Sequence, residues 1–145
     1  MGLYFSEFSE GQTFTSPRRT ITETDVVNFA GLSGDFNPLH TDAVFAESTP
    51  FKQRIAHGML SVAVSTGLGQ LLGIFEGTTL ALMSITSNFK APVFFGDTIH
   101  LRLTVQTTKP SAKGGRGTVV FLSEIVNQRD EVVVDGGWTV MLKDR

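Results

Sequence analysis

Polar and apolar residues often alternate along four segments in the second half of the chain, 79–90, 98–108, 117–128 and 131–142. These segments are rich in Val, Ile, Thr and Phe, the residue types that favour extended strands. Glycine-rich or charged stretches of a few residues lie between them, and such stretches are typical of hairpin connections. The pattern therefore predicts four consecutive antiparallel strands.

The first half of the chain predicts one strand followed by short helices. The strand is expected over 11–21, which is rich in Thr. Thr22 and Asp25 form the pattern of a helix N-cap with an acidic first turn, and this predicts a short helix as far as Ala30. A further helical turn is expected over 42–47.

The run from 55 to 75 carries no formal charge and predicts a long helix. It is long enough to suggest a membrane span, but it contains His57, Gln70 and four glycines, and its flanks lack anchoring residues. A helix that is apolar nearly all round is also typical of a protein interior. The order of elements predicts an α+β fold, in which an antiparallel sheet curls around this helix. Because such a sheet leaves edges that a second copy can pair with, we expect a homodimer or a dimer of dimers.

Composition and charge narrow the class of protein. At 145 residues the chain is expected to form a single domain over 1–145. Its net charge of −2 gives no basic footprint for a nucleic-acid partner. Without cysteine, the chain has no disulfide, catalytic thiolate or cysteine-bound metal. The N-terminus carries Glu7 and Glu10 and lacks the basic and apolar regions of a signal peptide, so we expect a cytoplasmic protein with no membrane partner.

The segment Ser-Gly-Asp-Phe-Asn-Pro-Leu-His, residues 33–40, is the strongest chemical signal in the sequence. Asp35 and His40 flank a turn in which Asn37 precedes Pro38, and proline cannot continue a helix backwards. An acid and a base that share one water can add that water across a double bond or remove it. The alternative interpretation is a capping aspartate beside a core histidine.

The start of the long helix is the second chemical signal. The first N–H groups of a helix have no intrahelical partners and lie at the positive end of the helix dipole. Gly58 would allow an oxygen of a ligand to approach them without meeting a Cβ, which would make an oxyanion donor. The alternative is a tolerated glycine, with His57 as a polar cap.

A metal centre can be assembled on paper from five residues near these motifs, Asp35, His40, Asp42, Glu47 and His57. The spacing of metal-ligand motifs such as HExxH is missing, and acid–base work explains a neighbouring carboxylate and imidazole equally well. We therefore expect neither a metal nor an organic cofactor.

Three stretches of the sequence resemble the MaoC-like, R-specific enoyl-CoA hydratase family. They are residues 33–46, Ile-Ala-His-Gly-Met at 55–59, and Asn-Phe-Lys-Ala-Pro-Val at 88–93, which is followed by Gly-Asp at 96–97. The resemblance spans nearly the whole chain. It implies a hot-dog fold, a long helix wrapped by an antiparallel sheet, which is usually dimeric.

The resemblance also implies roles for individual residues. Asp35 and His40 match the catalytic pair of the family, and Gly58 matches the residue whose N–H polarises the thioester carbonyl. Asn37 matches a motif residue that helps to hold the pair, and Thr66 stands where some relatives have a serine hydroxyl. We expect Asn37, Thr66 and also His57 to bind substrate. The implied reaction is syn addition of water to a trans-2-enoyl-CoA to give an (R)-3-hydroxyacyl-CoA, and its reverse.

Other functions stay open on the sequence. The same chemistry could act on an acyl-carrier-protein thioester or on a branched dicarboxylic acyl-CoA. A hot-dog acyl-CoA thioesterase would use a carboxylate against the thioester itself, and the complete Asp-x-Asn-Pro-x-His segment argues against it. A non-catalytic acyl-CoA-binding protein is disfavoured because both Asp35 and His40 are present.

Overall fold

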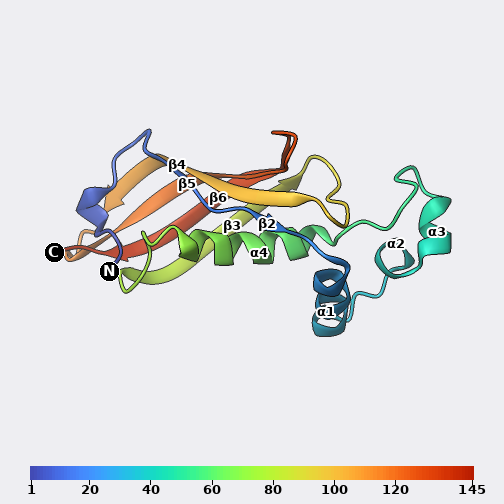
Figure 1. Cartoon of the computed structure of the whole chain (residues 1–145). Coiled ribbons are helices and arrows are strands. Elements are labelled where there is room, and N and C mark those ends of the chain that lie inside the picture. Colours follow the sequence, from blue (N-terminus) through green and yellow to red (C-terminus); the bar gives the residue numbers. More distant parts are fainter.

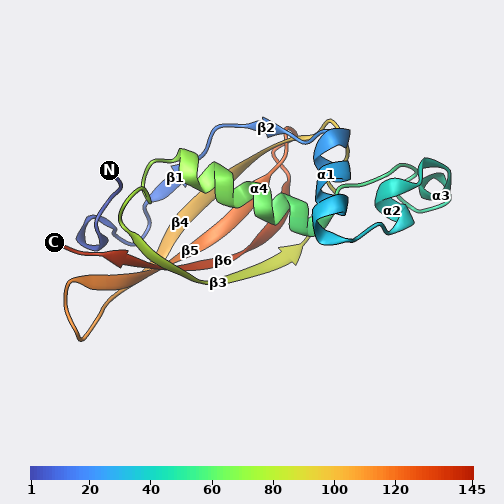
Figure 2. The same ribbon diagram turned by 90° about the horizontal axis from the view of Figure 1, so that it is seen from below.

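A six-stranded antiparallel sheet curves around one long helix in the computed structural model, which describes residues 1–145 (Figures 1 and 2). The strands are β1 (Thr13–Thr15), β2 (Arg19–Thr20), β3 (Thr79–Phe89), β4 (Thr98–Pro110), β5 (Arg116–Val126) and β6 (Val132–Lys143). The main order across the sheet is β1-β4-β5-β6-β3, and β2 also pairs with β4.

The helical elements lie between β2 and β3, apart from one short 3-10 turn near the N-terminus. They are η1 (Phe5–Glu7), α1 (Glu23–Ser33), α2 (Pro38–Thr41), α3 (Ala43–Glu47) and α4 (Gly58–Leu71). α4 lies along the concave face of the sheet, whereas α2 and α3 extend beyond one end of it (Figure 2). The segment between α1 and α4 therefore projects past the sheet, at the N-terminal end of α4.

The core lies between α4 and the concave face of the sheet. Every second residue of β4 is buried from Ile99 to Val105, as the two-residue period of a strand requires. Leu60, Val64 and Leu68 are buried along one face of α4 at helical spacing. Each large apolar side chain that is fully buried contributes about 1.5–3 kcal/mol to folding, so this interface holds α4 in place.

The opposite side of α4 is open, which differs from the expected helix that is covered nearly all round. Met59, Ala63, Thr66 and Gln70 are exposed along it. No helix in the structure is both long enough and apolar enough to cross a membrane. The uncharged run 55–75 is therefore only in part a helix, and one of its faces is buried.

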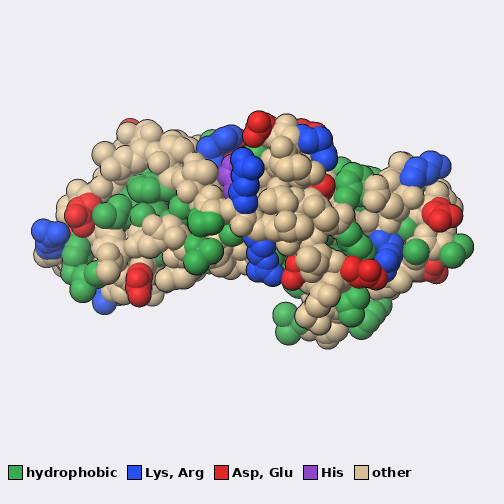
Figure 3. Space-filling model, in the orientation of Figure 1, with side chains coloured by type: hydrophobic (Ala, Val, Ile, Leu, Met, Phe, Trp, Pro, Cys, Tyr) green, Lys and Arg blue, Asp and Glu red, His purple; other side chains and the backbone are tan.

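The strand β3 forms an edge of the sheet. It pairs with β6 on one side only, and Leu80, Leu82, Met83 and Phe89 are exposed along it. Hydrophobic side chains also reach the surface of α1 (Figure 3), where Val27 and Leu32 are exposed.

The four strands predicted for the second half are confirmed to within about two residues. The single strand predicted over 11–21 is wrong: it divides into β1 and β2 on either side of Pro17, which has no N–H to donate to a ladder. The long helix begins at Gly58 rather than at residue 55, because Ile55 forms a β-bridge with Phe94 and the backbone of His57 is extended.

The outer face of the sheet carries a charged cluster away from the helices. Arg102 forms two hydrogen bonds to the carboxylate of Glu124, of 3.0 and 3.1 Å. Partial burial, together with the positive charges of Arg18 and Arg102, lowers the pKa of His100 from 6.5, and the negative charge of Asp130 opposes this shift.

Candidate active site

The turn after α1 is fixed by a chain of short-range hydrogen bonds. Gly34 ends α1 with a φ of 77°, a left-handed conformation that glycine adopts without strain. The N–H of Asp35 donates to Oγ of Ser33, and the N–H of Asn37 donates to Oδ1 of Asp35. The side chain of Asn37 then accepts from the N–H of Leu39 and caps α2. One carboxylate oxygen of Asp35 thus serves the turn, and the other is free for chemistry.

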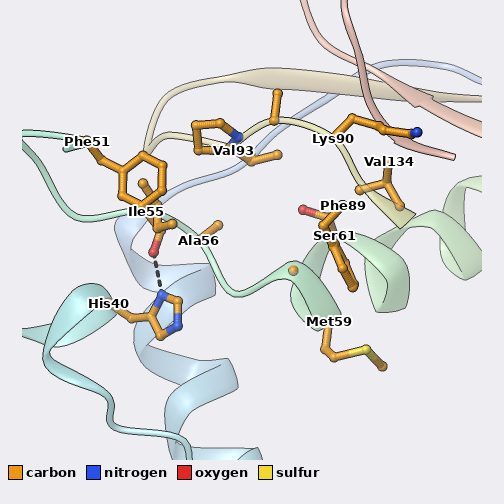
Figure 4. A pocket seen from close by; sticks show the side chains of 13 residues that line it. His40, Phe51, Ile55, Ala56, Met59, Ser61, Phe89, Lys90, Val93 and Val134 are labelled. Atoms are coloured by element: carbon orange, nitrogen blue, oxygen red, sulfur yellow. Dashed lines mark hydrogen bonds between the residues drawn. The ribbon is translucent and has the colours of Figure 1, made fainter. Parts of the chain in front are cut away.

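His40 lies on α2 with its orientation set from inside the protein. Its side chain is almost buried, and Nδ1 lies 2.7 Å from the carbonyl oxygen of Ile55 (Figure 4). Because a carbonyl can only accept, Nδ1 carries the proton, and Nε2 is the nitrogen left for proton exchange.

The two motif residues come together as the sequence predicts. A carboxylate oxygen of Asp35 and one ring nitrogen each of His40 and His57 all lie within 4.8 Å of one another. Two hydrogen bonds of ordinary length through one water span about 4.5 Å. The carboxylate of Asp35 and the imidazole of His40 can therefore hold a single water between them.

The N-terminus of α4 supplies donors beside this pair. The first N–H of α4 that bonds within the chain is that of Leu60, to the carbonyl of His57, so the N–H groups of Gly58 and Met59 are available. A Cβ on Gly58 would lie 2.5 Å from Cε1 of Phe89. Glycine at position 58 therefore allows the ring of Phe89 to lie directly against the start of the helix.

Two cavities meet at this point, and both are lined by His40, Gly58 and Met59. The larger, of about 440 Å³, is mainly apolar, and Lys90 is the only lysine, arginine or acidic residue that lines it. Its walls include Phe51, Ile55, Ala56, Phe89, Pro92, Val93 and Val134 (Figure 4). The smaller, of about 340 Å³, is lined in addition by Phe29, Ser33, Asp35 and His57. The apolar cavity suits a flexible carbon chain, and the polar one holds the acid–base pair.

His57 is buried beside the pair, at the wall of the smaller cavity. Its Nε2 lies 2.9 Å from the carbonyl oxygen of Asp35, and its ring stacks on that of His40 with centroids 3.8 Å apart and planes 26° apart. One ring nitrogen of each histidine is thus engaged by a main-chain carbonyl, that of Ile55 for His40 and that of Asp35 for His57.

The remaining predicted site residues lie as follows. Thr66 is about 12 Å along α4 from Gly58; its hydroxyl donates to the carbonyl of Ala63, and the residue lines a separate cavity of about 220 Å³. The structure does not bring it to the pair. The side chain of Asn37 is engaged in capping α2, which agrees with a role in holding the turn.

Sequence reasoning missed the residues that shape the apolar cavity. Phe51 lies in a loop, and Phe89 and Lys90 lie at the end of an edge strand. Phe89 and Lys90 stand in one of the quoted motif stretches, but nothing in their spacing indicates that they lie against the N-terminus of α4.

Comparison with known proteins identifies relatives of this chain. The sequence profile of the MaoC like domain family matches residues 7–125. Over 143 residues the chain is 39% identical to an (R)-specific enoyl-CoA hydratase of Rhodospirillum rubrum, covering 98% of this chain and 93% of that protein. The solved structure of the R-hydratase PhaJ1 from Pseudomonas aeruginosa has a TM-score of 0.79 and 34% identity, covering 99% of this chain and 88% of that one.

A more distant structural match identifies the fold by name. A Mycobacterium tuberculosis protein described as a double hot-dog fold has a TM-score of 0.80 and 21% identity, covering 99% of this chain and 45% of that one. The fold of the present chain is thus the hot-dog fold, as the sequence resemblance implied.

Proposed function

The chain belongs to the MaoC-like domain family, and from that premise we propose that it is a hydro-lyase acting on acyl-CoA thioesters. It hydrates trans-2-enoyl-CoA to (R)-3-hydroxyacyl-CoA and catalyses the reverse dehydration. The observation that carries this proposal is that the carboxylate of Asp35 and the ring of His40 approach to within 4.8 Å, beside the unbonded N–H groups at the start of α4.

The proposed mechanism uses one water held by Asp35 and His40. One of the pair removes a proton from this water as its oxygen attacks C3 of the enoyl thioester. The electron pair of the double bond moves toward the thioester carbonyl, and the N–H of Gly58 stabilises the negative charge on its oxygen. A proton then returns from the pair to C2 on the same face, so water adds without any net change in the protein. Nε2 of His40 is the imidazole atom that takes part, because Nδ1–H is held by Ile55.

Two effects of known typical size contribute to catalysis in this mechanism. General acid or base catalysis by a positioned side chain contributes about 10²–10⁴-fold. Loss of one oxyanion donor costs about 10²–10³-fold. The apolar cavity beside Gly58 supports this mechanism, because it can take up the hydrocarbon chain of an acyl thioester next to the helix N-terminus.

We further propose a homodimer, with the acyl-CoA substrate drawn from the cytoplasm. The free edge of β3 and its exposed leucines support pairing with a second copy. A thioester of acyl carrier protein is the alternative substrate, and the reaction at the acyl group would be the same.

The test of the function is the purified protein with crotonyl-CoA, monitored for loss of enoyl absorbance. Free thiol is assayed in parallel, and the product is analysed on a chiral column. We expect loss of absorbance without thiol release and formation of (R)-3-hydroxybutyryl-CoA. Thiol release would identify a thioesterase instead. No reaction with crotonyl-CoA, longer enoyl-CoA or enoyl carrier protein would reject the hydratase.

Two aspartate variants make a matched pair for this assay. Asp35→Asn keeps the side-chain shape but removes the carboxylate, so we expect turnover to fall at least about 10²-fold. Asp42→Asn removes a carboxylate seven positions further along, which caps α3 by accepting from the N–H of Phe45. Asparagine caps equally well, so the Asp42 variant should retain its activity. Equal activity in both variants would contradict the assignment of Asp35.

A further inference from the structure

His57 is a buried histidine that the proposed mechanism does not use. It is only 3% exposed and occupies the N-cap position of α4, yet its side chain makes no capping hydrogen bond. Its Nδ1 is buried with no hydrogen-bond partner. Such an unpaired buried polar atom costs about 1–3 kcal/mol, so a role in packing alone gives a poor account of a histidine at this position.

The two contacts of the His57 ring reach both members of the acid–base pair. Nε2 donates to the main-chain carbonyl of Asp35, because a carbonyl can only accept, and this places the proton on Nε2. One face of the ring stacks on His40, and Phe29 packs edge-on at a centroid distance of 4.9 Å.

The hydrogen bond to Asp35 has no substitute in the structure. Asp35 stands on an exposed turn, and the other hydrogen bonds of residues 34–37 run within the turn or to α1 and α2. The bond from His57 is the only one that joins this turn to the end of α4. His40, in contrast, has its own hydrogen bond to the carbonyl of Ile55, three residues before α4 begins.

We propose that His57 is the positioning residue that sets the separation of the Asp35 carboxylate from Nε2 of His40. It does so by two separable contacts, a hydrogen bond that holds the turn of Asp35 and a stack that fixes the plane of the His40 ring. This role rests on the proposed hydratase function. A displacement of about 1 Å between reacting groups can cost about 10²-fold in rate, so His57 acts on kcat without touching substrate.

Two substitutions separate the contacts. Phe at position 57 keeps an aromatic face against His40 but has no donor for Asp35. Gln at position 57 has an amide Nε2 that can donate to the Asp35 carbonyl, but it has no ring to stack. We expect His57→Phe to lower kcat by about 10–100-fold with KM within about threefold, and His57→Gln to recover part of that loss. His100→Gln, a substitution of the histidine on the outer face of the sheet, is the control and leaves kcat unchanged.

A double-variant cycle distinguishes positioning from general loss of structure. In an Asp35→Asn background the pair is already broken, so adding His57→Phe should change kcat by less than about threefold. Near-ultraviolet circular dichroism and thermal unfolding check that each variant is folded. The proposal is overturned if His57→Phe keeps kcat within threefold of the unmodified enzyme, or if its loss persists in full in the Asp35→Asn background. Absence of hydration by the unmodified protein would reject the proposed function instead, before any variant is compared.

Discussion

Gly58→Ala tests the proposed oxyanion donor, because the structure sets both what the added methyl meets and what it leaves intact. The backbone N–H is retained in the variant. The new Cβ would lie 2.5, 2.7 and 3.1 Å from Cε1, Cδ1 and Cζ of the Phe89 ring. Since real Cβ atoms do not approach carbon so closely, the ring must swing away from the helix. Phe89 is 54% exposed, so it has room to move.

The expected cost to stability is modest. Overpacking of this kind costs about 1–3 kcal/mol, and the higher helix propensity of alanine returns less than about 1 kcal/mol. A net loss of 1–2 kcal/mol corresponds to a fall in Tm of about 3–8 °C for a domain of this size. In a Phe89→Ala background the clash is absent, so Gly58→Ala should be neutral or slightly stabilising there.

The expected cost to activity is larger and does not depend on Phe89. A methyl group at the helix N-terminus keeps the thioester oxygen from the N–H of residue 58, and loss of such a donor lowers kcat by about 10²–10³-fold. Hydration of crotonyl-CoA is therefore measured for both single variants and the double variant, alongside thermal unfolding. If Gly58→Ala retains kcat within threefold, the methyl group does not separate the thioester oxygen from this N–H, and the reasoning is refuted. If removal of the Phe89 ring restores kcat, displacement of the ring caused the loss, and the reasoning fails in the same way.

Three further substitutions test the electrostatics and packing of the fold. The pKa of His100 is lowered from 6.5 by burial and by two neighbouring arginines, so the unfolded chain binds a proton at this histidine more tightly and the free energy of unfolding falls as pH drops below about 6.5. His100→Gln should lessen this loss, measured by urea unfolding between about pH 7.5 and 5.5. An unchanged loss would contradict the reasoning. Gly136→Ala would place a Cβ against the carbonyl of Thr86 on the neighbouring strand, so we expect little folded protein in expression trials. A folded variant with a normal Tm would contradict this, because it would show that β3 and β6 can move apart at this point. Thr22→Ala removes one half of the capping box with Asp25 and should cost about 0.5–2 kcal/mol by urea unfolding, while Thr22→Ser should restore most of it.

The sequence predicted the sheet better than the helices, for reasons that lie in particular residues. Val, Ile, Thr and Phe are frequent in β3 to β6, and one face of β4 and β5 is buried with the two-residue period of a strand. The four residues of α2 are too few to show a helical period, so they were hidden in a predicted turn. The absence of charge between 55 and 75 marks an apolar region of the chain, but not the point where the extended backbone of His57 gives way to helix.

The candidate site likewise has features that the sequence predicts and features that it does not. The five-residue spacing of Asp35 and His40 across Asn-Pro was enough to predict that the two side chains meet. The contact of His57 with Asp35 joins residues 22 positions apart, and no local pattern encodes it. Which nitrogen of His40 is free depends on the carbonyl of Ile55, a main-chain atom whose position follows only from the folded loop.

The two halves of the pair are held in different surroundings, and this asymmetry suits a reaction in which water is itself a substrate. His40 is almost buried, and the hydrogen bond to Ile55 fixes the orientation of its ring. Its free nitrogen, Nε2, therefore points in one fixed direction. Asp35 stands on an exposed turn, where a water can reach its carboxylate for hydration and leave it after dehydration. A fully enclosed pair would bind the water firmly but slow its exchange, whereas a fully exposed pair would not hold it in line with C3. The buried ring of His57 joins the two environments, because it bonds to the turn of Asp35 and stacks on His40.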